Sequence, residues 1–202
     1  YKGKGIGCYG DASVFSFHAT KVFNTIEGGA VTFSDHKLYE KLYNLKNFGI
    51  RGEELVTDVG ANAKMNEFCA IMGLCNLNHL EEALANRKKR YEYYKEKLKD
   101  VKGIHFLDRN GEATSNYAYF PILIGKEHGC TRDELYGKLR KKNIYARKYF
   151  YPITSDQACF RNKYKNVELD CARELSHKIL VLPFFEKIEE KQINHIVNIV
   201  RG

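Results

Sequence analysis

The sequence has no stretch approaching the ~20 consecutive apolar residues that a helix needs to cross a bilayer. It also has no charged segment followed by an apolar one near its beginning, a pattern typical of secretory signal peptides. We therefore predict that the protein does not span a membrane and lies in the cytoplasm. Because the first residue is Tyr1 and not methionine, we expect the natural start to lie upstream. At 202 residues the chain is long enough to bury a hydrophobic core.

Signatures of disulfide bonds and metal sites are also missing. The six cysteines form no Cys-x-x-Cys pair and have no histidine at the spacing of a zinc site, and the seven histidines are scattered. We predict that the protein binds no metal and that its cysteines are buried free thiols in a reducing compartment. These cysteines are Cys8, Cys69, Cys75, Cys130, Cys159 and Cys171.

The charge is unbalanced, with a formal net charge of +8. The basic clusters at residues 87–90 and 140–142 alternate with apolar or acidic neighbours at helical spacing, which indicates solvated helix faces. No basic motif interleaved with aromatic residues, as in RNA- or DNA-binding modules, is present. We therefore predict no nucleic-acid partner and instead a field that attracts a small anionic substrate. A basic nucleic-acid-binding protein is the alternative, and its binding would depend steeply on salt.

One lysine stands between two segments that are typical of strands. The first, residues 12–17, is followed by Lys21, and the second, residues 30–33, is opened by Gly28 and Gly29. A lysine held at the end of a sheet can form a Schiff base with a carbonyl substrate or with pyridoxal phosphate. A lone lysine after a strand is more often a surface residue. Here the glycines permit close approach of the backbone to a cofactor or a tight turn.

Helical spacing follows this segment. Ser34 is expected to cap a helix in which Leu38, Leu42 and Leu45 share one face, with Gly49 as its end.

Residues 49–63 show little periodicity and predict a loop, and loops of this length inside a domain are usually functional. Helical character then runs from about residue 66 to residue 98, with a break near residues 76–78. The part at residues 81–99 is rich in charged residues and tyrosine, which predicts a long exposed connecting helix.

The second half predicts a small α+β domain. Residues 117–124 are typical of a strand, and Pro121 favours an edge position for it. Thr131 and Glu134 match a capping box that opens a helix to about Lys142. The remaining predicted elements are a short strand at residues 144–146, a helix at 169–178, a strand at 179–182 and a final helix at 189–200, with Ile193, Ile196, Val197 and Val200 on its buried face.

The lysine segment closely resembles the DegT/DnrJ/EryC1/StrS family of pyridoxal-phosphate-dependent nucleotide-sugar aminotransferases. In that family a serine–phenylalanine pair precedes the lysine and Glu-Gly-Gly follows it. The resemblance covers nearly the whole chain, and one departure is Ile26, where many members carry glycine. The matching segments are Ser16-Phe17-His18-Ala19-Thr20-Lys21, Glu27-Gly28-Gly29, the block Gly60-x-Asn62-x-Lys64-Met65-Asn66-Glu67, the aromatic-proline segment Arg147–Pro152, and Leu182-Pro183.

The resemblance implies an α/β fold, the pyridoxal-phosphate-dependent transferase fold type I (aspartate aminotransferase-like). Residues 1–95 would form the C-terminal part of the large domain and residues 96–202 the small α+β domain. The same resemblance implies that the chain lacks the upstream half of such an enzyme, and that this fragment alone binds pyridoxal phosphate poorly and is inactive.

The resemblance also implies the site. Lys21 would hold pyridoxal 5′-phosphate as a Schiff base and act as the catalytic acid and base, and Ser16 would bind the phosphate. Asn62 would reach the cofactor phosphate of a neighbouring subunit, which implies a homodimer. Arg147, with a fork suited to oxyanions, Tyr149 and Tyr151 would bind the substrate, although packing or surface exposure explains these three equally well.

The implied reaction moves an amino group from glutamate (or glutamine) to a keto-deoxy sugar on a nucleoside diphosphate, most similar to thymidine-linked (dTDP) sugars. Its products would serve cell-surface polysaccharide or natural-product sugar biosynthesis. A dehydratase branch of the family carries histidine in place of the lysine, so Lys21 argues against it. A non-catalytic remnant or interaction module that keeps the fold is the alternative from another class.

Overall fold

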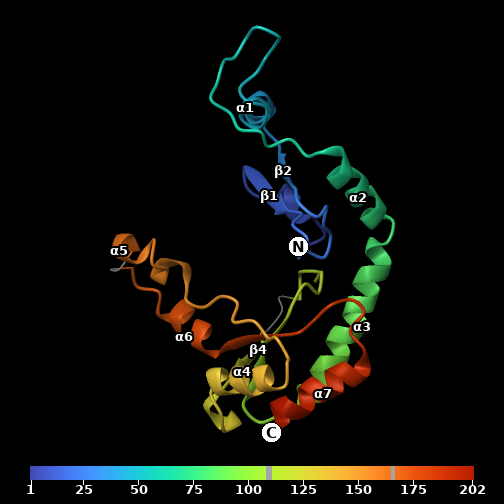
Figure 1. Ribbon diagram of the computed structural model, residues 1–202, viewed down its shortest axis with the longest axis vertical. Coiled ribbons are helices and arrows are strands. Elements are labelled where there is room, and N and C mark those ends of the chain that lie inside the picture. The colour runs from blue at the N-terminus through green and yellow to red at the C-terminus, as the bar shows by residue number, and fades with distance from the viewer. Residues whose placement is uncertain (108–110, 165–166) are drawn as a thin grey trace. The chain divides into compact units, whose positions relative to one another are not determined.

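The computed structural model describes residues 1–107, 111–164 and 167–202, and these form two compact units. Unit 1 comprises Tyr1–Glu82 and Gly111–Thr114, and unit 2 comprises Ala83–Asn110 and Ser115–Gly202. The division falls inside helix α3 (Leu80–Leu98), the green helix of Figure 1. The boundary predicted from the sequence, between residues 95 and 96, lies further along the same helix.

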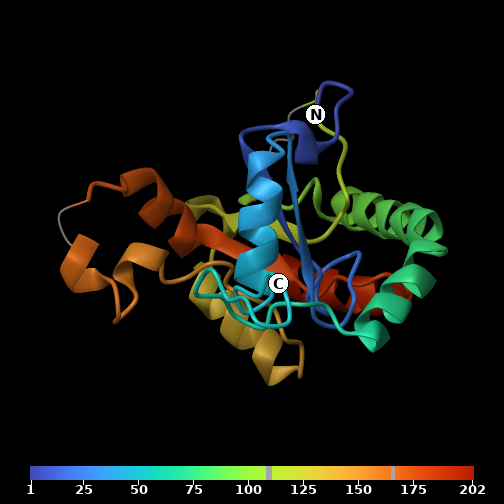
Figure 2. The ribbon, with the colours of Figure 1, turned by 90° about the horizontal axis from the view of Figure 1, so that it is seen from above.

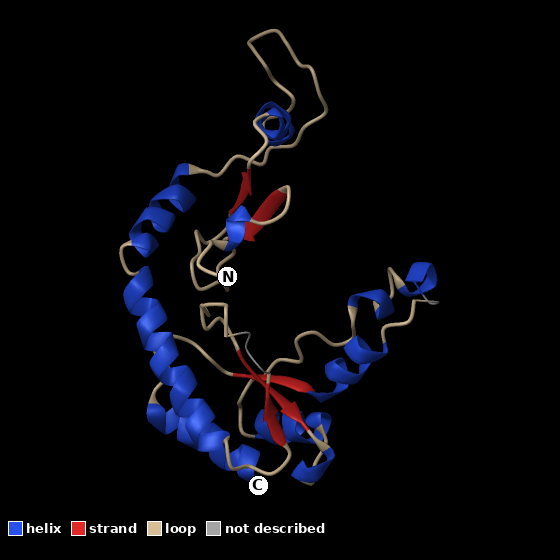
Figure 3. Ribbon diagram, turned by 180° about the vertical axis from the view of Figure 1, so that it is seen from behind, coloured by secondary structure: helices blue, strands red, loops and turns tan. Residues whose placement is uncertain are grey.

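The two units carry separate sheets, drawn in red in Figure 3. Unit 1 contains η1 (Ile6–Cys8), β1 (Ala12–Ser16), β2 (Gly29–Phe33), α1 (Lys37–Lys46) and α2 (Glu67–Leu77). Unit 2 contains most of α3, then β3 (Ile104–Phe106), β4 (Phe120–Ile124), η2 (Lys126–His128), α4 (Arg132–Lys141), η3 (Thr154–Asp156), α5 (Arg161–Tyr164), α6 (Asp170–Lys178), β5 (Ile179–Leu182) and α7 (Glu190–Arg201).

Unit 1 is built on an antiparallel pair of strands, β1 and β2, with Ala12 opposite Phe33 and Ser16 opposite Gly29. Both strands are predicted by the sequence, and the prediction is confirmed. Helix α1 lies beside this pair, as Figure 2 shows in light blue. The predicted cap at Ser34 is wrong. The helix begins at Lys37, and the Lys37 N–H donates to the carboxylate of Asp35 over 2.9 Å.

Helix α2 is capped by Asn66, whose side-chain oxygen accepts a hydrogen bond from the Cys69 N–H over 2.9 Å. The predicted break in the helical region is confirmed, since α2 ends at Leu77 and α3 starts at Leu80. Apolar side chains surround α2 instead of forming one stripe. Phe68, for example, is 85% exposed and Leu74 is 65% exposed. A helix that is apolar all round is usually enclosed by protein.

The predicted loop at residues 49–63 is confirmed. Two isolated antiparallel bridges, Asn47–Asn62 and Ile50–Val56, hold it together. Gly49 has a φ of +74°, and a Cβ atom at this position would lie 1.8 Å from the carbonyl oxygen of Asp58. The loop therefore depends on an approach of two backbone segments that no side chain would permit.

Unit 2 has a three-stranded antiparallel sheet in the order β3-β4-β5, so the predicted edge position of Pro121 is wrong. Pro121 lies opposite Val181, whose N–H and C=O bond to Arg147 on the far side over 2.8 and 2.9 Å. On its other side, β3 has already ended at Phe106, which lies opposite Ile122. Neither neighbour needs the N–H that proline lacks, so proline fits a central strand here.

The core of unit 2 lies between this sheet and the helices α3, α4 and α7. Along β4 every second side chain is buried in this core, namely those of Phe120, Ile122 and Ile124. The last turns of α3 also enter it through Tyr91, Tyr94 and Leu98, which corrects the expectation of an exposed connecting helix. Helix α7 runs along α3 (Figure 1), and its predicted buried face is confirmed.

Two further expectations need correction. Residues 144–146 form no strand, and the chain makes only an isolated bridge between Arg147 and Val181. Cys69 is buried and Cys130 half-buried, but the other four cysteines are exposed, so the prediction of buried thiols is wrong for them. No helix among the described residues is long and apolar enough for a membrane span.

Candidate functional site

The β1–β2 hairpin brings Ser16 and Lys21 to the same end of one element. Ser16 is the last residue of β1, and the Phe17 N–H donates to the Gly28 carbonyl over 2.9 Å, which closes the loop between the strands. Within the loop, the Lys21 N–H donates to the His18 carbonyl over 2.9 Å. The sequence therefore positions the lysine in a turn directly after the strand, as expected.

Both side chains of this pair retain binding capacity. Lys21 is exposed, and within the described ranges its amine makes no ion pair or hydrogen bond. The Ser16 hydroxyl accepts one long hydrogen bond, 3.4 Å, from the His18 N–H. The His18 ring is half-exposed, with Nδ1 3.0 Å from the Thr20 hydroxyl and Nε2 3.7 Å from a Glu27 carboxylate oxygen. An amine and a hydroxyl group from one end of a hairpin are groups that suit the aldehyde and the phosphate of a phosphorylated aldehyde.

The glycine pair serves the hairpin itself. A Cβ atom on Gly29 would lie 2.6 Å from the carbonyl oxygen of Phe15 on the paired strand. Three residues before Gly29 in the loop, Ile26 adopts a φ of +68° and is 48% exposed. This is the position where many members of the resembling family carry glycine, and a β-branched residue in the left-handed region is strained.

Substituting glycine for Ile26 is therefore expected to stabilise the protein. Relief of the left-handed strain outweighs the entropy that glycine adds to the unfolded chain, for a net gain of about 1 kcal/mol. Urea unfolding measures the change. Val14→Gly is the matched control, because Val14 is also exposed but its extended backbone gains nothing from glycine, so this variant should lose stability. Equal losses in both variants would refute strain at Ile26.

Asn62 lies in the long loop of unit 1, away from the hairpin loop in sequence. Its side-chain oxygen accepts a hydrogen bond from the Lys64 amine over 2.9 Å, and its backbone bridges to Asn47. The side chains of Asn62 and Lys64 are both exposed. Within the part of the chain that the structure describes, no hydrogen bond joins Asn62 to Ser16 or Lys21.

The other three candidates lie on one segment of unit 2. Arg147 is exposed, and its guanidinium makes no ion pair with any described residue. Tyr149 is half-buried between the ring of Phe150, with centroids 4.6 Å apart, and the edge of Tyr119, at 5.7 Å. Tyr151 remains 41% exposed. Arg147 is thus the free cation of this segment, while Tyr149 is partly committed to packing.

A group of charged residues that the sequence did not single out holds this segment in place. The buried Arg132 guanidinium lies 4.7 Å from the Tyr151 ring centroid, and its Nη1 donates to the Ser176 carbonyl over 2.8 Å. Asp133 accepts from both Arg132, at 2.7 Å, and Lys148, at 2.5 Å. The hydrogen bond from Lys148 and the nearby Arg132 charge lower the pKa of Asp133 from its ordinary value. The capping box at the start of α4 is the sequence signal that could have located this group, because it sets the helix start and so the positions of Arg132 and Asp133.

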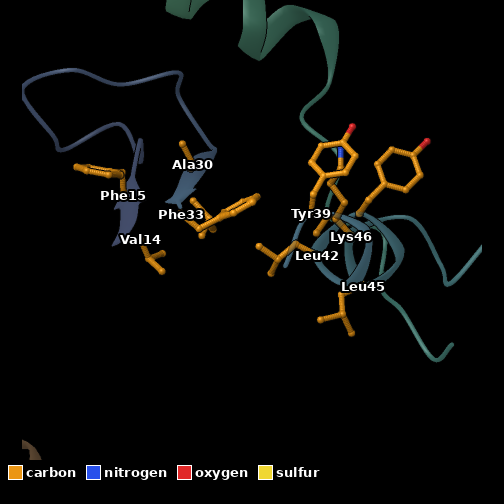
Figure 4. Close-up of a pocket in the computed structure, with 12 residues that line it drawn as sticks. Val14, Phe15, Ala30, Phe33, Tyr39, Leu42, Leu45 and Lys46 are labelled. Carbon is orange, nitrogen blue, oxygen red and sulfur yellow. The ribbon is translucent and has the colours of Figure 1, made fainter. Parts of the chain in front are cut away.

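An apolar groove of about 660 Å³ lies between the hairpin and α1 in unit 1 (Figure 4). None of the candidate residues lines it. A groove of this composition does not suit a phosphate or an amine. Its lining includes Val14, Phe15, Val31, Phe33, Leu42 and Leu45.

Comparison with known proteins decides the family. The model of the DegT/DnrJ/EryC1/StrS aminotransferase family matches residues 1–201. The chain belongs to this family. A dTDP-4-amino-4,6-dideoxy-D-glucose transaminase of Shigella dysenteriae is 40% identical over 193 residues, which cover 96% of this chain and 53% of that protein.

Solved structures of the family agree with the fold. DesI, crystallised in the presence of its TDP-sugar product, superposes with a TM-score of 0.90 at 32% identity over 98% of this chain and 51% of its own. PseC of Helicobacter pylori, an aminotransferase involved in the biosynthesis of pseudoaminic acid, superposes with a TM-score of 0.89 at 26% identity over 99% of this chain and 55% of its own. The predicted α/β fold of transferase type I is confirmed. The chain spans about half the length of these relatives.

Proposed function

We propose that the protein containing this chain transfers an amino group to a nucleotide-linked keto sugar with pyridoxal 5′-phosphate as cofactor. The observation that carries the proposal is the placement of an accessible, unpaired Lys21 amine and the Ser16 hydroxyl at one end of the β1–β2 hairpin. The family membership supports it, since the similar proteins are named as sugar transaminases. When bound, the cofactor acts as the electron sink for the carbon that carries the amino group.

In this proposal Lys21 has two tasks. Its amine would hold the cofactor at the aldehyde group, and the same amine would move a proton to and from the donor carbon. Ser16 donates a hydrogen bond to the cofactor phosphate, a dianion that is stabilised by neutral donors. Asn62 supplies a further donor to the phosphate in a second subunit, so the proposed enzyme is a homodimer.

Arg147, Tyr149 and Tyr151 form the proposed substrate segment. The unpaired guanidinium of Arg147 suits the pyrophosphate of the nucleotide sugar or the carboxylate of the donor, glutamate or glutamine. The exposed face of Tyr151 suits a sugar or base ring. We propose a thymidine-linked keto-deoxy sugar as substrate, which accords with the two relatives that are named for dTDP- and TDP-sugars.

We further propose that residues 1–95 and 96–202 correspond to part of the large domain and to the small domain of such an enzyme, and that the enzyme works in the cytoplasm. The chain spans about half of its relatives. We therefore expect this chain alone to bind pyridoxal phosphate poorly and to have no transaminase activity.

The deciding experiment is an assay of the full-length protein with glutamate, or glutamine, and a panel of keto-sugar nucleotides. The expected result is a 2-oxo acid and an amino sugar in equal amounts, fastest with a thymidine-linked substrate. Binding of the panel without turnover would favour a non-catalytic remnant that keeps the fold. Steeply salt-dependent binding to DNA or RNA, with no turnover, would favour a nucleic-acid-binding protein.

A further inference from the structure

A cysteine and a histidine form a pair in unit 2, apart from the candidate site. The imidazole Nδ1 of His128 lies 3.2 Å from the Sγ of Cys130. Both residues are partly buried. Cys159 and Cys171, in the same unit, are more exposed than Cys130, and among the described residues neither of them makes a hydrogen bond with a histidine.

The contact of the second ring nitrogen of His128 determines which nitrogen carries the proton in the neutral imidazole. Nε2 lies 2.8 Å from the carbonyl oxygen of Val200, which can only accept a hydrogen bond. Nε2 therefore carries the proton, and Nδ1 is left as an acceptor. The thiol of Cys130 is then the donor of the 3.2 Å contact, so the geometry favours transfer of its proton to Nδ1.

Two helix ends stabilise the charges that such a transfer creates. Val200 lies in the last turn of α7 (Glu190–Arg201), where carbonyl groups lack helical partners and the helix dipole favours a cation. Cys130 directly precedes Thr131, the N-cap of α4 (Arg132–Lys141), where the dipole favours an anion. The imidazolium and the thiolate thus each lie at the helix end of opposite sign.

We propose that Cys130, activated by His128, is a nucleophilic thiol that is modified by hydroperoxides. The thiolate sulfur attacks the oxygen of the peroxide that carries hydrogen, an S–O bond forms and the O–O bond breaks. The sulfur is oxidised by two electrons to a sulfenic acid while the peroxide is reduced. The departing oxygen takes the proton from Nδ1 of His128, which gives water from hydrogen peroxide and returns the imidazole to its neutral form.

The test treats the full-length protein with hydrogen peroxide, traps sulfenic acids with dimedone and quantifies each cysteine by peptide mass spectrometry. Cys130 is expected to label at least about 10-fold faster than Cys159 or Cys171, although these are more exposed. This ranking within the unmodified protein needs no variant. Labelling in order of exposure, with Cys130 the slower, would overturn the proposal.

The His128→Gln variant tests the partner. Its amide can still donate to the Val200 carbonyl but is no base, so labelling of Cys130 should fall to the level of Cys159 while that of Cys159 stays unchanged. His36→Gln, in unit 1, is the control and should change neither rate. An unchanged Cys130 rate in a folded His128→Gln variant, checked by circular dichroism, would refute activation by His128.

Discussion

Substituting alanine for Lys21 is expected to lower amino transfer by the full-length protein by at least about 10³-fold, because a positioned acid–base group alone contributes 10²–10⁴-fold. The variant should also lose the covalent attachment of pyridoxal phosphate. Stability should not change, since the Lys21 side chain is exposed and makes no ion pair among the described residues. Rapid-quench measurement of amino-sugar formation gives the rate, and thermal unfolding gives the stability.

Two further substitutions sharpen this test. Lys21→Arg keeps the positive charge, but a guanidinium group does not lose its proton in proteins and so cannot act as a nucleophile or base. This variant should therefore be as inactive as Lys21→Ala. Lys37→Ala removes another exposed lysine of unit 1, at the start of α1, and should leave the rate unchanged. Activity in Lys21→Ala within a few-fold of the unsubstituted protein would eliminate the proposed role, because no other amine is proposed for this step.

Substituting alanine for Phe120 is expected to destabilise the protein by about 3–5 kcal/mol, the usual cost of truncating a fully buried phenylalanine. Phe120 is 0% exposed. Its ring stacks on Tyr94 with centroids 4.6 Å apart and meets the edge of Tyr91 at 4.8 Å. Truncation would leave a cavity among these rings and remove their favourable contacts. Urea unfolding followed by circular dichroism measures the loss.

Phe150→Ala is the matched control for Phe120→Ala. The Phe150 side chain is 71% exposed and belongs to the same unit, so its removal should change the free energy of unfolding by about 0.5 kcal/mol or less. If both variants lost the same stability, the aromatic cluster around Phe120 would not be the core of unit 2.

Much of the fold is predictable from the sequence where local signals suffice. The hairpin strands, the capping box at Thr131 and the buried face of α7 each depend on residues within one or two turns of each other. For the same reason the break between α2 and α3 is visible in the sequence. Ser16 and Lys21 could be placed together because only a loop separates them.

The remaining features depend on contacts between distant residues. Pro121 is compatible with a central strand only because Val181 bonds to Arg147 and β3 ends early, which no local pattern encodes. In the sequence, Arg132 looks like one more surface charge on a basic helix. Its burial depends on contacts with the Tyr151 ring and the Ser176 carbonyl, which are distant in the sequence. Exposure of thiols likewise depends on which helix faces are covered.

The close contact at Gly49 limits how this sequence can diverge. With 1.8 Å between a notional Cβ and the Asp58 oxygen, even alanine at this position would force the two backbone segments apart. Descendants of this gene that replace Gly49 should therefore also differ in loop length, whereas those that retain the length should retain the glycine.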